Sequence, residues 1–205
     1  MASPIRLVAG LGNPGRGYER TRHNAGSWFA DALAAKLGGH FAHESRFGAD
    51  VARAGNLRIC KPTSFMNLSG RPVALLARFF GIAAEEILVA HDELDLAAGD
   101  ARLKLGGGHA GHNGLRDIHA QLGSGDYWRL RLGIGHPRDS DQPGRDVADY
   151  VLKSPEGADR DAIDAAVGRA LAVWPDIERG DLTRAMTALH TQSREASPSQ
   201  KRGGT

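Results

Sequence analysis

A histidine and an aspartate stand out among the residues of this chain that could do chemistry. His23 lies in the segment Thr21–Gly26, and Asp92 comes at the end of the expected strand 86–90, after the four apolar residues Ile87–Ala90. A partly buried carboxylate that accepts from one ring nitrogen fixes the histidine tautomer and leaves the other nitrogen free to deprotonate water. Each residue alone has a plainer interpretation, a helix cap for His23 and a turn residue for Asp92. Together they predict a hydrolytic site that activates water.

No side chain of the sequence offers an activated nucleophile. The Gly-x-Ser-x-Gly elbow of the serine hydrolases is missing from the sequence. The single cysteine, Cys60, stands between Ile59 and Lys61 at the end of an expected strand, without a base beside it. We therefore expect a packed thiol at this position and hydrolysis by water.

A metal site is the competing interpretation of the histidines. His109 and His112 are three residues apart. Further ligands would come from His91, Asp92 and Glu93. The pair lies in the glycine-rich segment 106–114, which lacks the helical His-Glu-x-x-His frame of zinc hydrolases. Since such a loop suits an anion or a closely approaching substrate, we expect no metal and no other cofactor. A metal-dependent hydrolase using His109 and His112 stays the alternative.

The first loop, Gly10–Gly15, also matches the Gly-x-Gly-x-x-Gly pattern of dinucleotide-binding turns. Such a turn leads directly into a helix, whereas helical periodicity begins here only near Asn24. The acidic residue at roughly the right spacing, Asp31, falls in the middle of the expected helix and not at a strand end. These departures argue against a dinucleotide site.

Uncharged amides and basic residues accompany the His–Asp pair in the sequence. Asn13, Asn67 and Asn113 each lie in a loop rich in glycine or serine. An amide offers both a donor and an acceptor, so three converging amides could bind a peptide backbone. Basic residues near the glycine-rich segment form either a solvated face or a phosphate-binding surface; they are Lys104, Arg116, Arg129 and Arg131.

The elements that would position these groups alternate between strands and helices. Expected strands are 5–10, 86–90 and 127–133, with a hairpin of 50–54 and 56–60; expected helices are 24–37, one that follows Ser69, 115–122, 155–177 and 182–190. Ser69 is expected to cap a helix that buries Val73, Leu76, Phe79 and Phe80. Because sites gather at the carboxyl ends of strands in open α/β sheets, the polar segments should meet at one edge.

The totals describe one ordinary globular domain. The chain has 205 residues, 41% of them hydrophobic, and a formal net charge of +2. We expect a single α/β domain over residues 1–190, with a twisted mixed sheet flanked by helices. Residues 191–205 lack apolar side chains to pack and are expected to form a disordered tail. The sequence predicts neither a signal peptide nor a membrane span, and one cysteine fits a reducing cytosol.

Five segments of the chain, in order, resemble the bacterial-type peptidyl-tRNA hydrolases. They are Gly10–Gly15, Thr21–Gly26, Lys61–Gly70, His91–Asp95 and Gly106–Gly114. The resemblance runs from about residue 5 to 190, and its departures are small: Ala110 and Ser64 stand where glycine and threonine are frequent. It implies a cytoplasmic, monomeric, metal-independent enzyme of phosphorylase/hydrolase-like fold that cleaves the ester between a peptide and the 3′ end of tRNA. A tRNA 3′-end binding module without catalysis is a second alternative.

The resemblance also implies roles for individual residues. His23 matches the catalytic base, and Asp92 the carboxylate that keeps it basic. Asn13 matches the amide that separates N-blocked peptidyl-tRNA from free aminoacyl-tRNA. Positions that match substrate contacts are Tyr18, Phe65, Asn67, His112 and Asn113. Lys104 and Arg131 match basic positions that hold the 5′ phosphate of tRNA.

Overall fold

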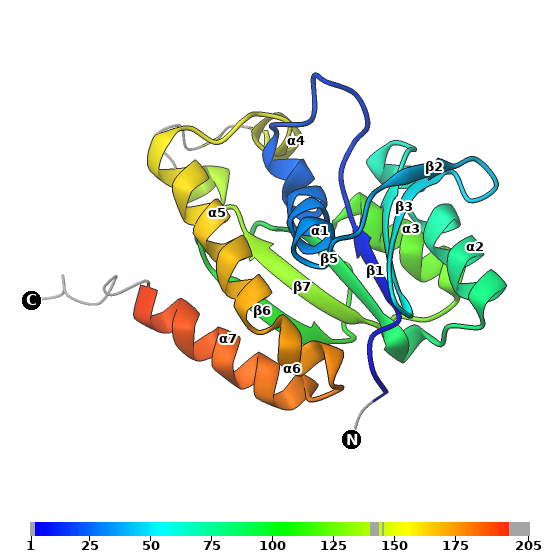
Figure 1. Ribbon diagram of the computed structural model, residues 1–205. Helices are drawn as coiled ribbons and strands as arrows, with labels where there is room; N and C mark the ends of the chain where they lie inside the picture. Colours follow the sequence, from blue (N-terminus) through cyan, green and yellow to red (C-terminus); the bar gives the residue numbers. More distant parts are fainter. Residues whose placement is uncertain (1–2, 140–143, 145, 197–205) are drawn as a thin grey trace, which may run out of the picture.

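Seven strands form one mixed sheet in the part of the chain that the computed structural model describes, residues 3–139, 144 and 146–196 (Figure 1). The strand order is β2-β3-β4-β1-β5-β7-β6. Four neighbouring strands run parallel: β4 (Leu57–Pro62), β1 (Leu7–Gly10), β5 (Ile87–Glu93) and β7 (Trp128–Gly133). The outer strands pair antiparallel: β2 (Ala42–Glu44), β3 (Ala49–Ala54) and β6 (Ala101–Leu105). The predicted mixed sheet is confirmed.

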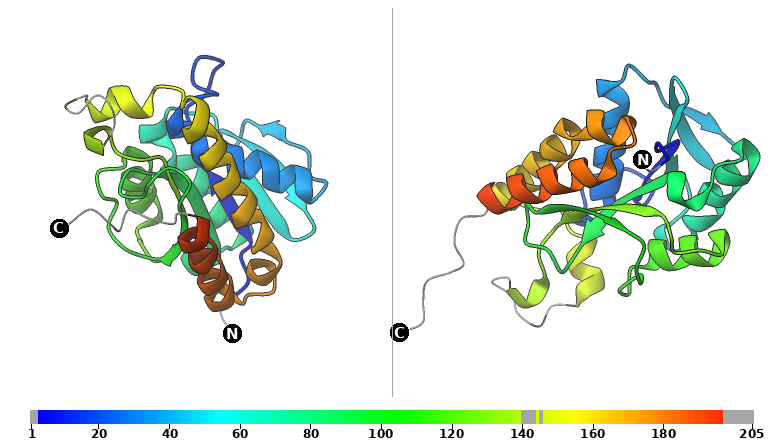
Figure 2. Two further views of the ribbon diagram at one scale, coloured as in Figure 1. Left: turned by 90° about the vertical axis from the view of Figure 1, so that its left-hand side faces the viewer. Right: turned by 90° about the horizontal axis from the view of Figure 1, so that it is seen from below.

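Helices cover both faces of the sheet (Figure 2). One face carries α1 (Ala25–Lys36), α5 (Gly157–Ala172), α6 (Trp174–Glu178) and α7 (Leu182–Ala196); the other carries α2 (Gly70–Phe80) and α3 (Asn113–Leu122). Along β1, Val8 belongs to the first core, whereas Leu7 and Ala9 belong to the second. Both faces of the central strands are therefore buried, which explains why they read as continuous apolar runs.

Glycines let α1 lie against β1 and β5 at close range. A Cβ on Gly26 would collide with the backbone oxygen of Ala90, and one on Gly10 would come within 2.5 Å of the Ala30 Cβ. The 3-10 turn Arg22–Asn24, which precedes α1, is thereby held next to the carboxyl end of β5. This close packing positions His23 beside Asp92.

The start of α2 differs from its prediction. Ser69 makes no side-chain capping bond; instead the Asp117 carboxylate on α3 accepts from the Gly70 amide at 2.7 Å. A Cβ on Gly70 would meet the Asp117 backbone, so α3 approaches too closely for any other residue. Phe79 is 60% exposed and not buried as expected, whereas Leu76 is fully buried.

Several elements are longer or shorter than predicted, or were missed. β5 includes the His91–Glu93 segment, and Asn113 begins α3 instead of lying in the loop before it. The predicted helix 155–177 is divided at Val173 into α5 and α6. β2, β6 and the short helix α4 (Val147–Val151) were not predicted.

The carboxyl-terminal helix continues past the expected end at His190. α7 runs to Ala196, and the buried hydroxyl of Ser193 bonds both backbone groups of Ala101 on the edge strand β6. Residues 191–196 are therefore helical, while the rest of the expected tail, 197–205, lies outside the described residues. Among the helices that the structure describes, none is long and apolar enough to span a bilayer.

Candidate active site

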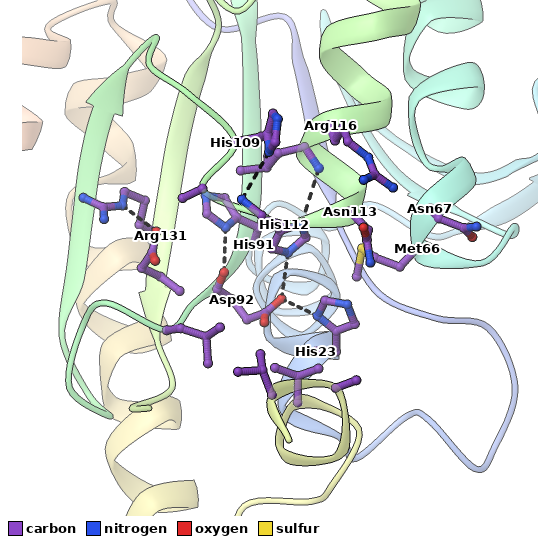
Figure 3. A pocket seen from close by; sticks show the side chains of 18 of the residues that line it. His23, Met66, Asn67, His91, Asp92, His109, His112, Asn113, Arg116 and Arg131 are labelled. Carbon is purple, nitrogen blue, oxygen red and sulfur yellow. Dashed lines mark hydrogen bonds and ion pairs between the residues drawn. The ribbon is translucent and has the colours of Figure 1, made fainter. Parts of the chain in front are cut away.

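A cavity of about 900 Å³ opens beyond the carboxyl ends of β1 and β5, beside the start of α3 (Figure 3). All ten residues that the sequence placed in the site line it: Asn13, Tyr18, His23, Phe65, Asn67, Asp92, Lys104, His112, Asn113 and Arg131. They come from six separate segments of the chain, so the predicted convergence at one edge of the sheet is what the structure shows.

The Asp92 carboxylate lies between two histidines (Figure 3). Its Oδ1 is 2.9 Å from Nδ1 of His23 and 3.0 Å from Nε2 of His112. The aspartate is 3% exposed, and the two imidazole side chains are 12% and 10% exposed. One carboxylate oxygen thus orients both rings at the wall of the cavity.

Hydrogen bonds fix which nitrogen of each ring carries a proton. Nδ1 of His112 accepts from the backbone amides of Gly114 and Leu115 at the start of α3, so its Nε2 carries the proton and donates to Asp92. In the neutral ring of His23, Nδ1–H donates to the same carboxylate. The lone pair of His23 is then on Nε2, the position that a general base needs.

The charge of Asp92 sets the proton affinity of its neighbour. Burial by itself lowers the pKa of His23, but the carboxylate charge and the hydrogen bond from Asp92 raise it, and the net shift is upward. Burial opposes ionisation of Asp92, yet the two histidines more than offset this effect and hold its pKa well below the usual range. Asp92 is therefore a carboxylate at neutral pH.

His91 and Cys60 are buried groups that stay uncharged at neutral pH. Burial and the nearby His112 lower the pKa of His91 to about 3, and its Nδ1–H donates to the backbone oxygen of Asp92 at 2.7 Å. Cys60 is fully buried, and burial raises the pKa of its thiol to about 12. The expectation of a packed, unreactive cysteine is confirmed.

The donor set does not fit the metal alternative. Ligand-type atoms of His23, Asp92 and His112 lie within 4.8 Å of one another. However, both histidine nitrogens that face the carboxylate carry the hydrogen-bonding proton, whereas a metal needs their lone pairs. His109 is not part of this group; its Nδ1 accepts from the Gly111 amide at 3.2 Å. The arrangement is that of a hydrogen-bonded His–Asp–His chain.

Asn13 presents a donor to the cavity in a fixed orientation. Its side-chain Oδ1 accepts from the Met66 amide at 2.7 Å. Its backbone is held by two bonds with the Asn24 side chain, at 2.9 and 3.0 Å. The side-chain NH₂ group is consequently the part of Asn13 that can meet a substrate.

Two other amides and two aromatic rings line the same side of the cavity. No hydrogen bond engages the side chain of Asn67 or Asn113 within the described residues, and both residues are exposed. Tyr18 and Phe65 meet edge to face with ring centroids 6.1 Å apart, which joins their two loops. The free amides can bind polar groups of a chain lying along these rings.

The basic residues separate into exposed and buried groups. Lys104 has no ion-pair partner in the described part of the chain, while Nε of Arg131 donates to Glu93 at 2.8 Å. Arg129 is 4% exposed and not part of a solvated face as one reading of the sequence had it. Its guanidinium donates to the backbone oxygens of Gly107 and Gly108 and thereby holds the glycine-rich loop from beneath.

Sequence reasoning missed an apolar wall of the cavity. It is formed by α4 and the residue after it, through Val147, Ala148, Val151 and Leu152. Asp146 caps this helix by accepting from the Ala148 amide at 2.7 Å. A five-residue helix has no usable periodicity, so only its aspartate cap signalled it in the sequence.

Comparison with known proteins decides the family. The sequence profile of the peptidyl-tRNA hydrolases matches residues 7–197. The chain belongs to the peptidyl-tRNA hydrolase family. It is 54% identical over 196 residues to the peptidyl-tRNA hydrolase of Thiobacillus denitrificans, covering 96% of this chain and 94% of the relative. It is 50% identical to that of Coxiella burnetii, covering 93% of this chain and all of the relative.

Solved structures of peptidyl-tRNA hydrolases have the same fold. The crystal structure of the Acinetobacter baumannii enzyme superposes with a TM-score of 0.86 at 40% identity, covering 93% of this chain and 96% of the other. A complex of a peptidyl-tRNA hydrolase with N-propanol gives a TM-score of 0.84 at 40% identity, covering 91% and 94%. Similarity over nearly the whole length confirms the resemblance that the five sequence motifs indicated.

Proposed function

We propose that this peptidyl-tRNA hydrolase cleaves its substrate with a water molecule that His23 deprotonates, and that the step needs no metal ion. The observation that carries the mechanism is the His23–Asp92 hydrogen bond of 2.9 Å at the wall of the cavity. It supplies an oriented base whose developing positive charge is stabilised by a buried carboxylate. Family membership supports hydrolysis of peptidyl-tRNA over the two alternatives.

The reaction balances with one water and no other reactant. Nε2 of His23 takes a proton as the water oxygen attacks the ester carbonyl, forming a tetrahedral oxyanion. Collapse of the oxyanion breaks the bond to the ribose 3′ oxygen, which receives the proton from His23. The products are free tRNA and a peptide carboxylate, with one proton released. An aminoacyl-type ester is already reactive, so a positioned base and amide donors suffice.

Three amides divide the recognition of the peptide. The fixed NH₂ group of Asn13 donates to the acyl oxygen that blocks the amino group, which free aminoacyl-tRNA lacks. Asn67 and Asn113 hold the ester and its peptide, and their NH₂ groups can donate to the oxyanion. The rings of Tyr18 and Phe65 support the substrate chain beside them.

We assign the tRNA contacts to the side of the cavity that β6 and β7 form, across from Asn67 (Figure 3). Lys104 and Arg131 hold the 5′ phosphate of the acceptor stem, and the Arg131–Glu93 ion pair keeps the guanidinium in place. His112 contributes by orienting Asp92 at the cavity wall. A monomer suffices for this arrangement, because a single chain supplies every residue named. A single cysteine fits an enzyme that acts in the reducing cytoplasm.

Hydrolysis of N-acetyl-aminoacyl-tRNA by His23→Ala, with and without EDTA, tests the mechanism. We expect a loss of about 10²–10⁴-fold in kcat, as for removal of a general base, and full wild-type activity in EDTA. His43→Ala is the matched control, because His43 forms a similar 3.0 Å bond with Asp50 but is exposed on β2. It should keep wild-type activity.

Each alternative predicts a different result in the same assay. Wild-type turnover by a folded His23→Ala variant would refute the assignment of the base. Loss of wild-type activity in EDTA would instead favour the metal-dependent hydrolase. Binding without product in a single-turnover reaction would favour a tRNA-binding module.

A further inference from the structure

Arg22, the residue directly before His23, is a buried arginine that the mechanism does not use. It is 8% exposed. Its backbone amide donates to the Lys153 oxygen at 3.0 Å, and its guanidinium donates to the backbone oxygen of Ser154 at 3.2 Å. The second guanidinium arm reaches Asp159 at 3.2 Å. Arg22 thus joins the turn that carries the base to the segment between α4 and α5 and to the first turn of α5.

The same guanidinium also contacts α4 itself. Its central carbon lies 4.3 Å from the centroid of the Tyr150 ring, a cation–π contact. The Tyr150 hydroxyl donates in turn to the backbone oxygen of Ile134 after β7, at 2.8 Å. Arg22 therefore holds α4 through the Tyr150 ring and through the backbone oxygens of Lys153 and Ser154, which follow the helix.

This contact network needs arginine. Burying a cation is costly unless its donors are satisfied, and a guanidinium directs several donors in a fixed plane. Here the two terminal nitrogens donate to two backbone oxygens and one carboxylate while the flat face lies on a ring, and the buried Nε has no partner among the described residues. An ammonium group could reach one of these partners but could neither bridge them nor stack in the same way.

The helix held by Arg22 is the apolar wall of the active-site cavity. Figure 3 shows its ribbon next to His23, and α4 packs against the turn of residues 22–24. Val147 and Leu152 are each 40% exposed at this wall. With only five residues, α4 depends on tertiary contacts for its stability.

We propose that Arg22 is a positioning residue that ties α4 to the turn carrying His23 and so keeps the apolar wall against the catalytic base. The inference rests on the proposed role of His23 and extends it to a residue that does not touch the substrate. Releasing the tie would let water reach the imidazole and would loosen the wall of the substrate cavity.

Loss of the Arg22 contacts should change the pKa of His23, an effect that an arginine with a purely structural role would not have. Burial lowers the pKa of His23, so exposing the ring raises that pKa. The charged and titratable groups that contact His23 are Asp92 from β5 and His112 from the start of α3. Arg22→Gln also removes the cation next to His23, whereas Arg22→Lys keeps that charge and loses only the bridging geometry. The acid limb of the kcat/KM profile should therefore move to higher pH.

The test compares Arg22→Gln and Arg22→Lys with Arg160→Gln. Arg160 is the matched control, because it makes the same two kinds of contact, an ion pair with Asp164 and a cation–π contact with Trp28 at 4.0 Å, with partners outside α4. For Arg22→Gln we expect amide exchange of residues 147–154 to accelerate about tenfold or more without substrate, and kcat/KM to fall by about 10- to 100-fold. The acid limb should move upward. Arg22→Lys should lie between this variant and the wild type.

Unchanged exchange over residues 147–154 in a folded Arg22→Gln protein, or an unmoved acid limb, would overturn the proposal. If Arg22→Gln does not fold, Asp159→Asn removes one arm of the same contact at a side chain that is 48% exposed. It should change exchange and pH profile in the same directions by less, and no change in either would equally refute the tie. Because exchange is measured without substrate, an inactive wild-type protein would contradict the proposed function and leave the tie testable.

Discussion

Asp92→Asn isolates the charge of the carboxylate from its geometry. Both His23 and His112 donate to the same oxygen, Oδ1. An asparagine that keeps its own oxygen at this place still accepts both bonds, and its NH₂ group takes the position of Oδ2. The substitution therefore removes one negative charge while preserving the positions of both rings.

The expected loss of rate follows from the electrostatics of this pair. As His23 takes a proton from water it becomes an imidazolium beside the carboxylate, 2.9 Å away between the bonded atoms. Two unit charges about 4 Å apart at an effective dielectric constant of about 20 attract by about 4 kcal/mol. At about 1.4 kcal/mol per factor of ten, full proton transfer would make this about 10³-fold in kcat. Because the transfer is partial in the transition state, we expect a fall of about 10²- to 10³-fold.

The pH profile of Asp92→Asn should shift in a defined direction. The carboxylate raises the pKa of His23 in the native protein, and the base works only in its neutral form. Activity is thus lost as the pH falls through that pKa. Without the charge the pKa drops, so the acid limb of kcat/KM moves to lower pH, opposite to the shift expected for Arg22→Gln.

The assay is single-turnover hydrolysis of N-acetyl-aminoacyl-tRNA across pH. Asp95→Asn is the control, since it removes the same charge from an exposed position three residues further along the chain. A fall of less than tenfold in Asp92→Asn, or an acid limb that stays or moves upward, would refute the reasoning. A shift of the same size in Asp95→Asn would show that net charge, and not this contact, is responsible.

Three further substitutions test recognition and stability. Asn13→Asp keeps an oxygen for the Met66 amide but replaces the NH₂ donor by a carboxylate, so cleavage of free relative to blocked aminoacyl-tRNA should rise; an unchanged ratio would contradict the role of Asn13. Ser193→Ala leaves both backbone groups of Ala101 unpaired and should lower the free energy of unfolding in urea by about 1–3 kcal/mol, whereas Thr191→Ala on the exposed side of α7 should change it little. Ala110 has a φ of +47°, so Ala110→Gly should raise the free energy of unfolding by about 0.5–1 kcal/mol; destabilisation would count against strain at this position.

The central elements of the fold were predictable because their local signals are strong. β1 and β5 are apolar runs of strand length, and α1 carries Phe29 and Leu33 at helical spacing. β6 had a usable signal that was missed: apolar Ala101 and Leu103 alternate with basic residues. β2 has three residues, all at least partly exposed, and gives no comparable pattern.

Elements whose boundaries depend on distant partners could not be predicted from local sequence. The Ser69 capping prediction was wrong because Asp117, 47 residues away from Gly70, supplies the acceptor. α7 extends past His190 because Ser193 finds the unpaired edge of β6, 92 residues earlier in the chain. Such contacts exist only after the sheet has formed.

The sequence by itself determined the family and which side chains meet in the cavity, because its motifs follow strands whose carboxyl ends share one edge. It also indicated a histidine–carboxylate pair instead of a cysteine nucleophile. Only the tertiary structure decided that one oxygen of Asp92 serves both His23 and His112, that Asn13 presents its NH₂ group, and that Arg22 joins the base to α4. Hydrogen-bond direction and burial arise from groups far apart in the chain, and the pKa of each group follows from them.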